Sequence, residues 1–257
     1  MIRLAMMDGW ALLTVDRPEA RNALNLETLE QLDASLRELE QLESLRALVL
    51  TGAGERVFIS GGDLKEFERI RGMEAARQMA SRYQEVLNRL ERFPVPVVAA
   101  INGHALGGGC EVALACDFRI MAEEATLRFK QVQMGLVTGW GSGPRLLSLV
   151  GYAQAMHLLL LGEEVDAKTA LAVGLAHDVA PREQLDERVE AWIRKLMAAP
   201  PLAARSVKQL LQKWRGMPLA EAQKLEREHF AALWETEDHW EASRATLEKR
   251  RPVFKGR

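Results

Sequence analysis

One stretch of the chain, residues 101–117, joins an apolar strand to a helix through three consecutive glycines. It reads Ile-Asn-Gly-His-Ala-Leu-Gly-Gly-Gly-Cys-Glu-Val-Ala-Leu-Ala-Cys-Asp. Passing from strand to helix through a short turn is the repeating step of folds in which helices cover a largely parallel sheet. We therefore expect an α/β fold organised around this connection.

The same stretch can support chemistry. Gly107, Gly108 and Gly109 carry no side chain, so a substrate can approach their backbone closely. The first amides of the helix that follows lack partners within the helix and carry the positive end of its dipole. Glu111 lies in the first turn of that helix. This arrangement suits a developing oxyanion beside a carboxyl group that moves a proton.

A purely structural explanation accounts for this stretch about as well as the catalytic one. A glycine run can simply allow close packing of a strand against a helix, and a first-turn Glu can simply stabilise the helix dipole. The spacing also differs from the G-x-G-x-x-G and G-x-x-x-x-G-K-[ST] phosphate-binding motifs. The rest of the chain has to decide between the two explanations.

A second glycine turn follows another apolar segment. Residues 58–65 read Phe-Ile-Ser-Gly-Gly-Asp-Leu-Lys, so a short strand breaks into Gly61 and Gly62 before a predicted helix. Alone, this would be a plain strand-to-helix connection. Two such turns in one chain can each supply an amide to the same oxygen, which is what an oxyanion hole requires.

The remaining segments before residue 101 alternate between strand and helix. Strands are predicted at residues 10–16, 46–51 and 97–101, and the second is almost entirely apolar, as expected for a strand covered on both faces. A long helix is predicted over residues 73–92. An earlier helix carries leucines at helical spacing, namely Leu29, Leu32, Leu36, Leu39 and Leu42. This alternation predicts a β/α core.

Downstream of the central stretch the pattern changes. Strands are expected at residues 118–122 and 126–129, and a glycine-broken loop at residues 130–143 contains Gln131 and Trp140. The rest of the chain is predicted to be mostly helical, with glycines and prolines as punctuation.

We therefore divide the chain into a core at residues 1–179 and a helical C-terminal region at residues 180–257. The second region contains Trp192, Trp214, Trp234 and Trp240. Aromatic residues at helical spacing either fill a core or form a subunit interface, and the sequence favours neither.

The composition of the chain limits the classes of molecule that we expect it to bind. The chain has 257 residues, 48% of them apolar and 27% charged, which is an ordinary globular balance. A formal charge of -2 gives no global attraction to nucleic acid or an anionic membrane. We find neither an apolar run of about 18 residues nor a secretory signal pattern. We expect a cytoplasmic protein with no nucleic-acid or membrane partner.

The two cysteines, Cys110 and Cys116, both fall on the predicted helix after the glycines. Six residues of helix separate their Cα atoms by roughly 9 Å, which exceeds the usual disulfide reach of about 7 Å. We expect reduced core thiols. With His104 as the one nearby histidine, we also expect no metal site.

These motifs together resemble the crotonase family, the enoyl-CoA hydratase/isomerase superfamily, across nearly the whole chain. The matching residues are Arg17-Pro18, Asn22-Ala23-Leu24, Phe58, Ser60-Gly61-Gly62-Asp63-Leu64, Ile101-Asn102-Gly103, Ala105-Leu106-Gly107-Gly108-Gly109, Glu111, Cys116-Asp117, Met134-Gly135 and Glu248-Lys249-Arg250. The resemblance implies a ClpP/crotonase fold of repeated ββα units, with a C-terminal helical region that helps to build trimers or hexamers. It also implies acyl-CoA substrates, so coenzyme A enters as part of the substrate and no separate cofactor is expected.

The resemblance also implies roles for individual residues. The amides of Gly62 and Gly108 would form the oxyanion hole for the thioester carbonyl, and Glu111 would be a catalytic carboxyl group. The substrate and its CoA would contact Arg21, Ala23, Gly61, Asp63, Leu64, Lys65 and Trp140. Lys249 matches a family lysine that reaches the CoA of a neighbouring subunit, although a basic terminus is more often simply solvated.

One position departs from the hydratases of the family. They use two glutamates to hold and activate water, and the second falls on Gln131. An amide can orient a ligand through hydrogen bonds but cannot exchange a proton near neutral pH. The sequence therefore predicts an oxyanion hole with a single carboxyl group.

Decarboxylation of a malonyl-type thioester needs an enolate-stabilising site and no activated water. The local sequence is also similar to the ethylmalonyl-CoA and methylmalonyl-CoA decarboxylase branch, although Thr138 replaces a proline and Ser142 a glycine of that branch. We expect an acyl-CoA lyase that favours decarboxylation. The alternatives are 2-enoyl-CoA hydration and a non-catalytic CoA- or RNA-binding scaffold.

Overall fold

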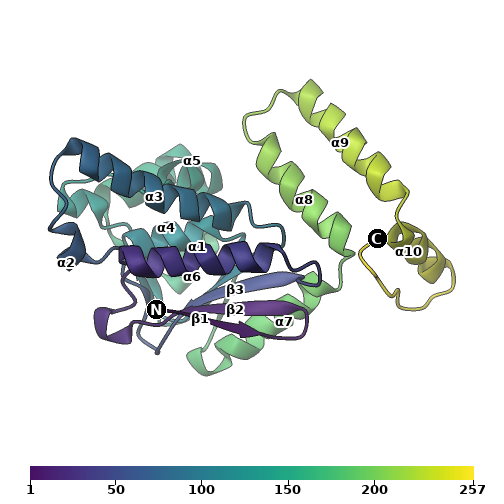
Figure 1. Cartoon of the computed structure of the whole chain (residues 1–257), viewed down its shortest axis with the longest axis horizontal. Coiled ribbons are helices and arrows are strands. Elements are labelled where there is room, and N and C mark those ends of the chain that lie inside the picture. The colour runs from purple at the N-terminus through teal and green to yellow at the C-terminus, as the bar shows by residue number, and fades with distance from the viewer.

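The computed structural model describes all 257 residues, which form two sheets surrounded by helices (Figure 1). The larger sheet has the strand order β1-β2-β3-β5-β7-β10. Its strands are β1 Ile2–Met6, β2 Trp10–Val15, β3 Ala47–Gly52, β5 Val97–Ile101, β7 Phe118–Ala122 and β10 Asp178–Ala180. Every neighbouring pair is parallel except β1 with β2.

The smaller sheet has the strand order β4-β6-β8-β9. Its strands are β4 Val57–Ile59, β6 His104–Leu106, β8 Thr126–Arg128 and β9 Glu164–Asp166. Along the chain, a strand of the large sheet is followed by a strand of the small sheet and then by a helix. This ββα step recurs, so the expected architecture of repeated ββα units is confirmed.

The helices of the first part of the chain cover these sheets. They are α1 Leu26–Glu40, α2 Leu64–Phe67, α3 Met73–Glu91, α4 Gly108–Ala115, α5 Ser142–Leu161 and α6 Ala167–Ala172, with short 3-10 turns η1 Pro18–Ala20 and η2 Gln131–Met134. Asn25 caps the start of α1, because its side chain accepts a hydrogen bond from the Thr28 N–H. Leu29, Leu32, Leu36 and Leu39 of α1 are buried, as their spacing predicts.

The C-terminal part of the chain contains η3 Arg182–Gln184, α7 Leu185–Met197, α8 Pro201–Trp214, α9 Leu219–Trp234 and α10 Glu237–Leu247. Helix α7 still belongs to the central core, because Leu185, Val189 and Ile193 are buried in the same apolar cluster as the sheets. Helices α8 to α10 stand apart from the sheets (Figure 1). None of the helices combines the length and hydropathy needed to cross a membrane.

The expected boundary between residues 179 and 180 falls inside β10, so the chain leaves the core only after α7. Trp192 of α7 packs against the core, whereas Trp234 and Trp240 are about half exposed, at 47% and 49%. Both the division into two regions and the assembly of subunits through the second remain predictions.

The central stretch differs from the expected single strand. Strand β5 ends at Ile101, and the chain crosses to the small sheet, where β6 forms a separate strand that ends at Leu106. The Asn102 side chain holds this crossing by donating to the carbonyl oxygens of Gly52 and Gly54, each at 2.7 Å. The glycines that line the pocket therefore follow a strand of the small sheet.

The cysteines behave as expected. Cys110 lies in α4 and Cys116 follows its last residue; both are buried free thiols. Burial raises the pKa of both, and that of Cys116 to about 12. They are core residues that stay protonated at neutral pH.

Candidate active site

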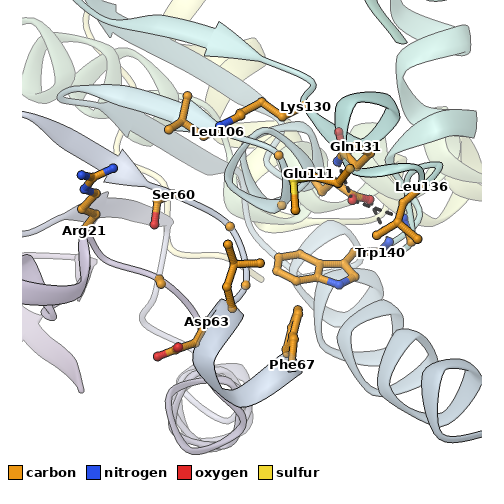
Figure 2. Close-up of a pocket in the computed structure, with 18 of the residues that line it drawn as sticks. Arg21, Ser60, Asp63, Phe67, Leu106, Glu111, Lys130, Gln131, Leu136 and Trp140 are labelled. Carbon is orange, nitrogen blue, oxygen red and sulfur yellow. Dashed lines mark hydrogen bonds between the residues drawn. The ribbon is translucent and has the colours of Figure 1, made fainter. Parts of the chain in front are cut away.

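A pocket of about 700 Å³ opens where the two glycine turns meet (Figure 2). Four segments line it: the early loop around η1, the turn between β4 and α2, the junction of β6 with α4, and the loop at residues 130–140. Each of these segments follows a strand or precedes a helix of the ββα units. The fold therefore brings together turns that are far apart in the sequence.

The two glycine turns pack directly against each other. A side chain at Gly61 would place its Cβ only 3.1 Å from the backbone nitrogen of Gly108. Gly61 also has a φ of 102°, which side chains rarely tolerate. Gly108 is the first residue of α4, so its N–H has no acceptor within the helix.

Aromatic rings cover the two glycines expected to form the oxyanion hole. A Cβ on Gly62 would lie 2.1 Å from a ring carbon of Phe67, and one on Gly108 would lie 2.1 Å from a ring carbon of Trp140. A Cβ on Gly109 would lie 1.8 Å from the carbonyl oxygen of Ile59. All three positions therefore exclude any side chain, which accounts for the glycines by close packing as well as by chemistry.

A buried amide fixes the early loop against the connection between β3 and β4. Asn22 is 1% exposed, and its Nδ2 donates to the carbonyl oxygens of Ala53 at 2.9 Å and Val57 at 2.7 Å. Arg21 and Asn22 adopt positive φ angles of 54° and 55°. This turn leaves Arg21 and Ala23 lining the pocket.

Glu111 is the most elaborately held side chain of the site. It is 2% exposed, and its two oxygens accept four hydrogen bonds. Oε1 accepts from Gln131 Nε2 at 3.0 Å and the Gly139 N–H at 3.3 Å, while Oε2 accepts from the Trp140 N–H at 2.8 Å and the Ser142 N–H at 3.2 Å. All four partners are hydrogen-bond donors, so both oxygens of Glu111 act as acceptors. Glu111 thus also anchors the backbone of residues 139–142.

Gln131 lies in η2 and reaches Glu111 with its amide nitrogen (Figure 2). Its Oε1 is buried and has no hydrogen-bond partner within the protein. The residue therefore turns a donor toward the carboxylate and keeps a free acceptor. No second carboxylate lies against Glu111, since the other pocket-lining acids are Glu19 and Asp63.

The residues expected to contact CoA lie along the same pocket, with one exception. The lining includes Arg21, Ala23, Gly61, Asp63, Leu64, Lys65 and Trp140. Lys249 follows α10, which lies at the opposite end of the molecule from α2 (Figure 1). Its expected contact with the CoA of a neighbouring subunit remains a prediction.

Asp63 is tied to the early loop by an ion pair. Its Oδ2 lies 3.0 Å from Arg17 Nη2. Burial would raise the pKa of this carboxyl group, but the hydrogen bond and charge of Arg17 outweigh burial and lower the pKa. Asp63 also caps α2 by accepting from the Lys65 N–H at 3.1 Å. These contacts give the Asp63 carboxylate a structural role, because it joins the early loop to the start of α2.

Sequence reasoning missed several residues of this site. Phe67, Met79, Lys130 and Leu136 line the pocket, and Tyr83 stands behind it, fully buried in α3. Phe67 and Lys130 could have been found, because they lie close in sequence to the glycine turn and to Gln131. The sequence around Tyr83 gives no sign of a functional role, except that its hydroxyl group lies on the apolar face of a helix.

Comparison with known proteins shows the family to which the chain belongs. The chain belongs to the enoyl-CoA hydratase/isomerase family, whose family model matches residues 6–257. The resemblance to the crotonases is thereby confirmed, and the chain is a member of an enzyme family that acts on acyl-CoA.

Individual relatives carry two kinds of name. A probable enoyl-CoA hydratase of Bacillus subtilis (strain 168) is 38% identical over 256 residues, covering 99% of this chain and 98% of the relative. An ethylmalonyl-CoA decarboxylase of Xenopus laevis is 35% identical over 229 residues, covering 88% and 76%. The crystal structure of an enoyl-CoA hydratase from Bacillus anthracis has a TM-score of 0.95 at 33% identity, covering 100% of this chain and 99% of that one. Family membership alone therefore leaves the reaction open.

Proposed function

We propose that this protein is a lyase that binds the carbonyl oxygen of an acyl-CoA thioester at the amides of Gly62 and Gly108. Charge that develops on that oxygen would face two backbone N–H groups, one of them at the start of α4. The adjacent Glu111 would exchange a proton with the substrate. The contact between the two glycine turns supports this proposal.

The CoA portion would bind along the basic side of the pocket. Arg17 is neutralised by Asp63, but Arg21, Lys65 and Lys130 also line the pocket and take part in no ion pair. Phosphate groups favour such unpaired cations. The phosphate groups of the proposed CoA substrate would thus supply the negative charge that these three cations lack within the protein.

The reaction we favour is decarboxylation of a malonyl-type CoA thioester, and the observation that carries it is the hydrogen bond from Gln131 Nε2 to Glu111 Oε1. The position of a second carboxylate is occupied by an amide that cannot transfer a proton near neutral pH. The site would therefore have one proton-transfer group. A single group is enough for decarboxylation, whereas activation of water by paired carboxylates needs two.

In this reaction the bond between C2 and the carboxylate carbon breaks, and carbon dioxide leaves. The electron pair stays on C2 and is delocalised onto the thioester oxygen in the oxyanion hole. Glu111 then donates a proton to C2, which restores the thioester, and solvent returns a proton to Glu111. Of the other lining carboxyl groups, Asp63 is paired with Arg17 and Glu19 lies in the early loop.

The proposal is tested by incubating the purified protein with methylmalonyl-CoA and ethylmalonyl-CoA and measuring carbon dioxide and the shortened acyl-CoA. We expect turnover of at least one of them, a large loss of rate in Glu111→Gln, and no change in Glu124→Gln, an exposed acid outside the pocket. Absence of turnover with both substrates would overturn the decarboxylase proposal.

A second candidate, hydration of a 2-enoyl-CoA, is favoured by the free Gln131 Oε1. A water molecule could donate one hydrogen to this oxygen and the other to Glu111. Relatives named as hydratases point the same way. A kcat/KM for crotonyl-CoA above that for both malonyl-type thioesters would establish hydration instead.

A further inference from the structure

Tyr83 links the two halves of the proposed oxyanion hole without lining the pocket. It lies in α3, is completely buried, and is absent from the residues that line the pocket. Its contacts run in two directions, toward Gly62 and toward Gly108.

The hydroxyl group reaches the segment that pairs with Gly62. Tyr83 Oη donates to the carbonyl oxygen of Leu24 at 2.8 Å. Leu24 forms an isolated parallel bridge with Gly62, because its N–H donates to Gly61 O at 2.8 Å and its carbonyl accepts from the Asp63 N–H at 3.0 Å. Burial raises the pKa of the Tyr83 phenol, so the group remains a donor at neutral pH.

The ring of Tyr83 contacts the two aromatic residues that cover the glycines. It meets Phe67 edge to face, with the ring centroids 5.8 Å apart at 87°. It stacks on Trp140, with the centroids 4.0 Å apart at 9°. Phe67 and Trp140 occupy the space into which a Cβ on Gly62 or Gly108 would project. Phe67, Tyr83 and Trp140 thus form one aromatic row that contacts both glycines through its two outer rings.

We propose that Tyr83 is a positioning residue that fixes the separation and direction of the Gly62 and Gly108 amides. This inference rests on the proposed function of those amides. An oxyanion hole works only if both donors are in place before charge develops, and small displacements are costly. Tyr83 is placed to transmit any shift of α3 to both donors at once.

The test uses two variants and one control. Tyr83→Phe keeps the ring and removes the hydrogen bond to Leu24, whereas Tyr83→Leu also removes the aromatic stacking. Leu90→Ala, which opens a cavity at another buried position of α3, controls for loss of stability alone. The readouts are kcat with whichever of methylmalonyl-CoA, ethylmalonyl-CoA and crotonyl-CoA the wild-type protein turns over, the Kd of acetyl-CoA, and the carbonyl stretching frequency of bound acetyl-CoA labelled with carbon-13.

We expect kcat to fall by about tenfold in Tyr83→Phe and by about 10²-fold in Tyr83→Leu, with the Kd of acetyl-CoA changed less than about threefold. The carbonyl frequency should move toward its value in water in the same order. Leu90→Ala should lower the unfolding temperature and leave the carbonyl frequency unchanged.

Two outcomes would overturn the inference in different ways. A wild-type carbonyl shift that Tyr83→Leu retains in full, or that Leu90→Ala loses equally, would remove the role of Tyr83 and leave the oxyanion hole intact. A wild-type protein that binds acetyl-CoA without any carbonyl shift would overturn the proposed hole itself.

Discussion

Lys208 Nζ lies 2.6 Å from Asp117 Oδ2, so an ion pair joins α8 to the residue that precedes β7. The Lys208 side chain is 7% exposed, and its ammonium group also donates to Val95 O at 3.0 Å. Asp117 Oδ2 in turn accepts from the Val97 N–H at 2.7 Å. These contacts attach α8 to the amino-terminal ends of β5 and β7, two interior strands of the larger sheet.

Replacing Lys208 by Met should destabilise the protein, because it leaves the Asp117 carboxylate without its cation in a largely buried place. Since the Asp117 side chain keeps 24% exposure, we expect a loss of about 3 kcal/mol in the free energy of unfolding, at the low end for buried pairs. Chemical denaturation measures it. Lys213→Met, on the exposed surface of α8, is the matched control, and an equal effect of both variants would refute the prediction.

Gln131→Glu should increase hydration of crotonyl-CoA, because it places a second proton-transfer group against Glu111. Acid-base catalysis is worth up to a factor of about 10² to 10⁴, which sets the upper limit of the gain. The loss of enoyl absorbance reports the rate. Gln131→Leu should show no increase in the hydration rate. An increase in Gln131→Leu, or no increase in Gln131→Glu, would show that residue 131 does not determine the reaction.

Gly62→Ala and Gly108→Ala should each lower kcat by a factor of about 10² to 10³, the usual effect of losing one oxyanion-hole donor. The new Cβ must displace the ring of Phe67 or Trp140, and the backbone N–H moves with it. Steady-state kinetics measures the loss. Combining Gly62→Ala with Phe67→Ala makes room for the methyl group, so partial recovery of kcat relative to Gly62→Ala alone is the decisive comparison.

Lys130→Met should weaken binding of acyl-CoA, because Lys130 is one of the unpaired cations that line the pocket. If Lys130 contacts CoA phosphates, Kd should rise equally for acetyl-CoA and malonyl-CoA and stay constant for pantetheine thioesters. If it contacts an acyl carboxylate, only the malonyl compounds should bind less well. Calorimetry distinguishes these cases. Lys168→Met removes an exposed charge outside the pocket, and equal affinities of both variants for every ligand would contradict the prediction.

His177 should make the protein less stable in mild acid. Burial, followed by the charge of Arg119, lowers the pKa of His177 to about 4, and its Nδ1 lies 3.2 Å from the Arg119 N–H, which it can serve as acceptor only when neutral. The unfolded chain therefore binds this proton more readily. The contribution of neutral His177 to the free energy of unfolding is fully present above about pH 6.5 and is lost as the pH falls toward 4. His177→Gln should flatten this decline relative to His229→Gln, and equal slopes would exclude His177 as its source.

The fold was predictable from the sequence where an element carries its own signal. The apolar strands β3 and β5 and the leucine face of α1 were recognised locally, and the motifs identified the family. The sequence does not predict β1, β6, β9 or β10; the last three have three residues each, too few for a periodic pattern. The pairing of β6 and β9 depends on the smaller sheet and that of β10 on β7 of the larger sheet, and no local pattern reveals either.

The site was predictable to the same extent. Its glycine turns have a sequence signature, and Gln131 was noticed because it departs from a motif. Tyr83 could not be found in this way, because its contact with Leu24 joins residues 59 positions apart. Contacts of that kind are created by packing, and only the folded chain brings them together.

The four hydrogen bonds to Glu111 have a consequence for how a family of this kind diversifies. Glu111 holds the Gly139, Trp140 and Ser142 amides, whereas the Gln131 side chain makes a single hydrogen bond and leaves its oxygen unused. The backbone of residues 139–142 thus depends on Glu111 and not on Gln131. We therefore expect an exchange of residue 131 to cost the fold little, so that, if the Gln131→Glu prediction holds, a single codon change would redirect the chemistry without altering the rest of the enzyme.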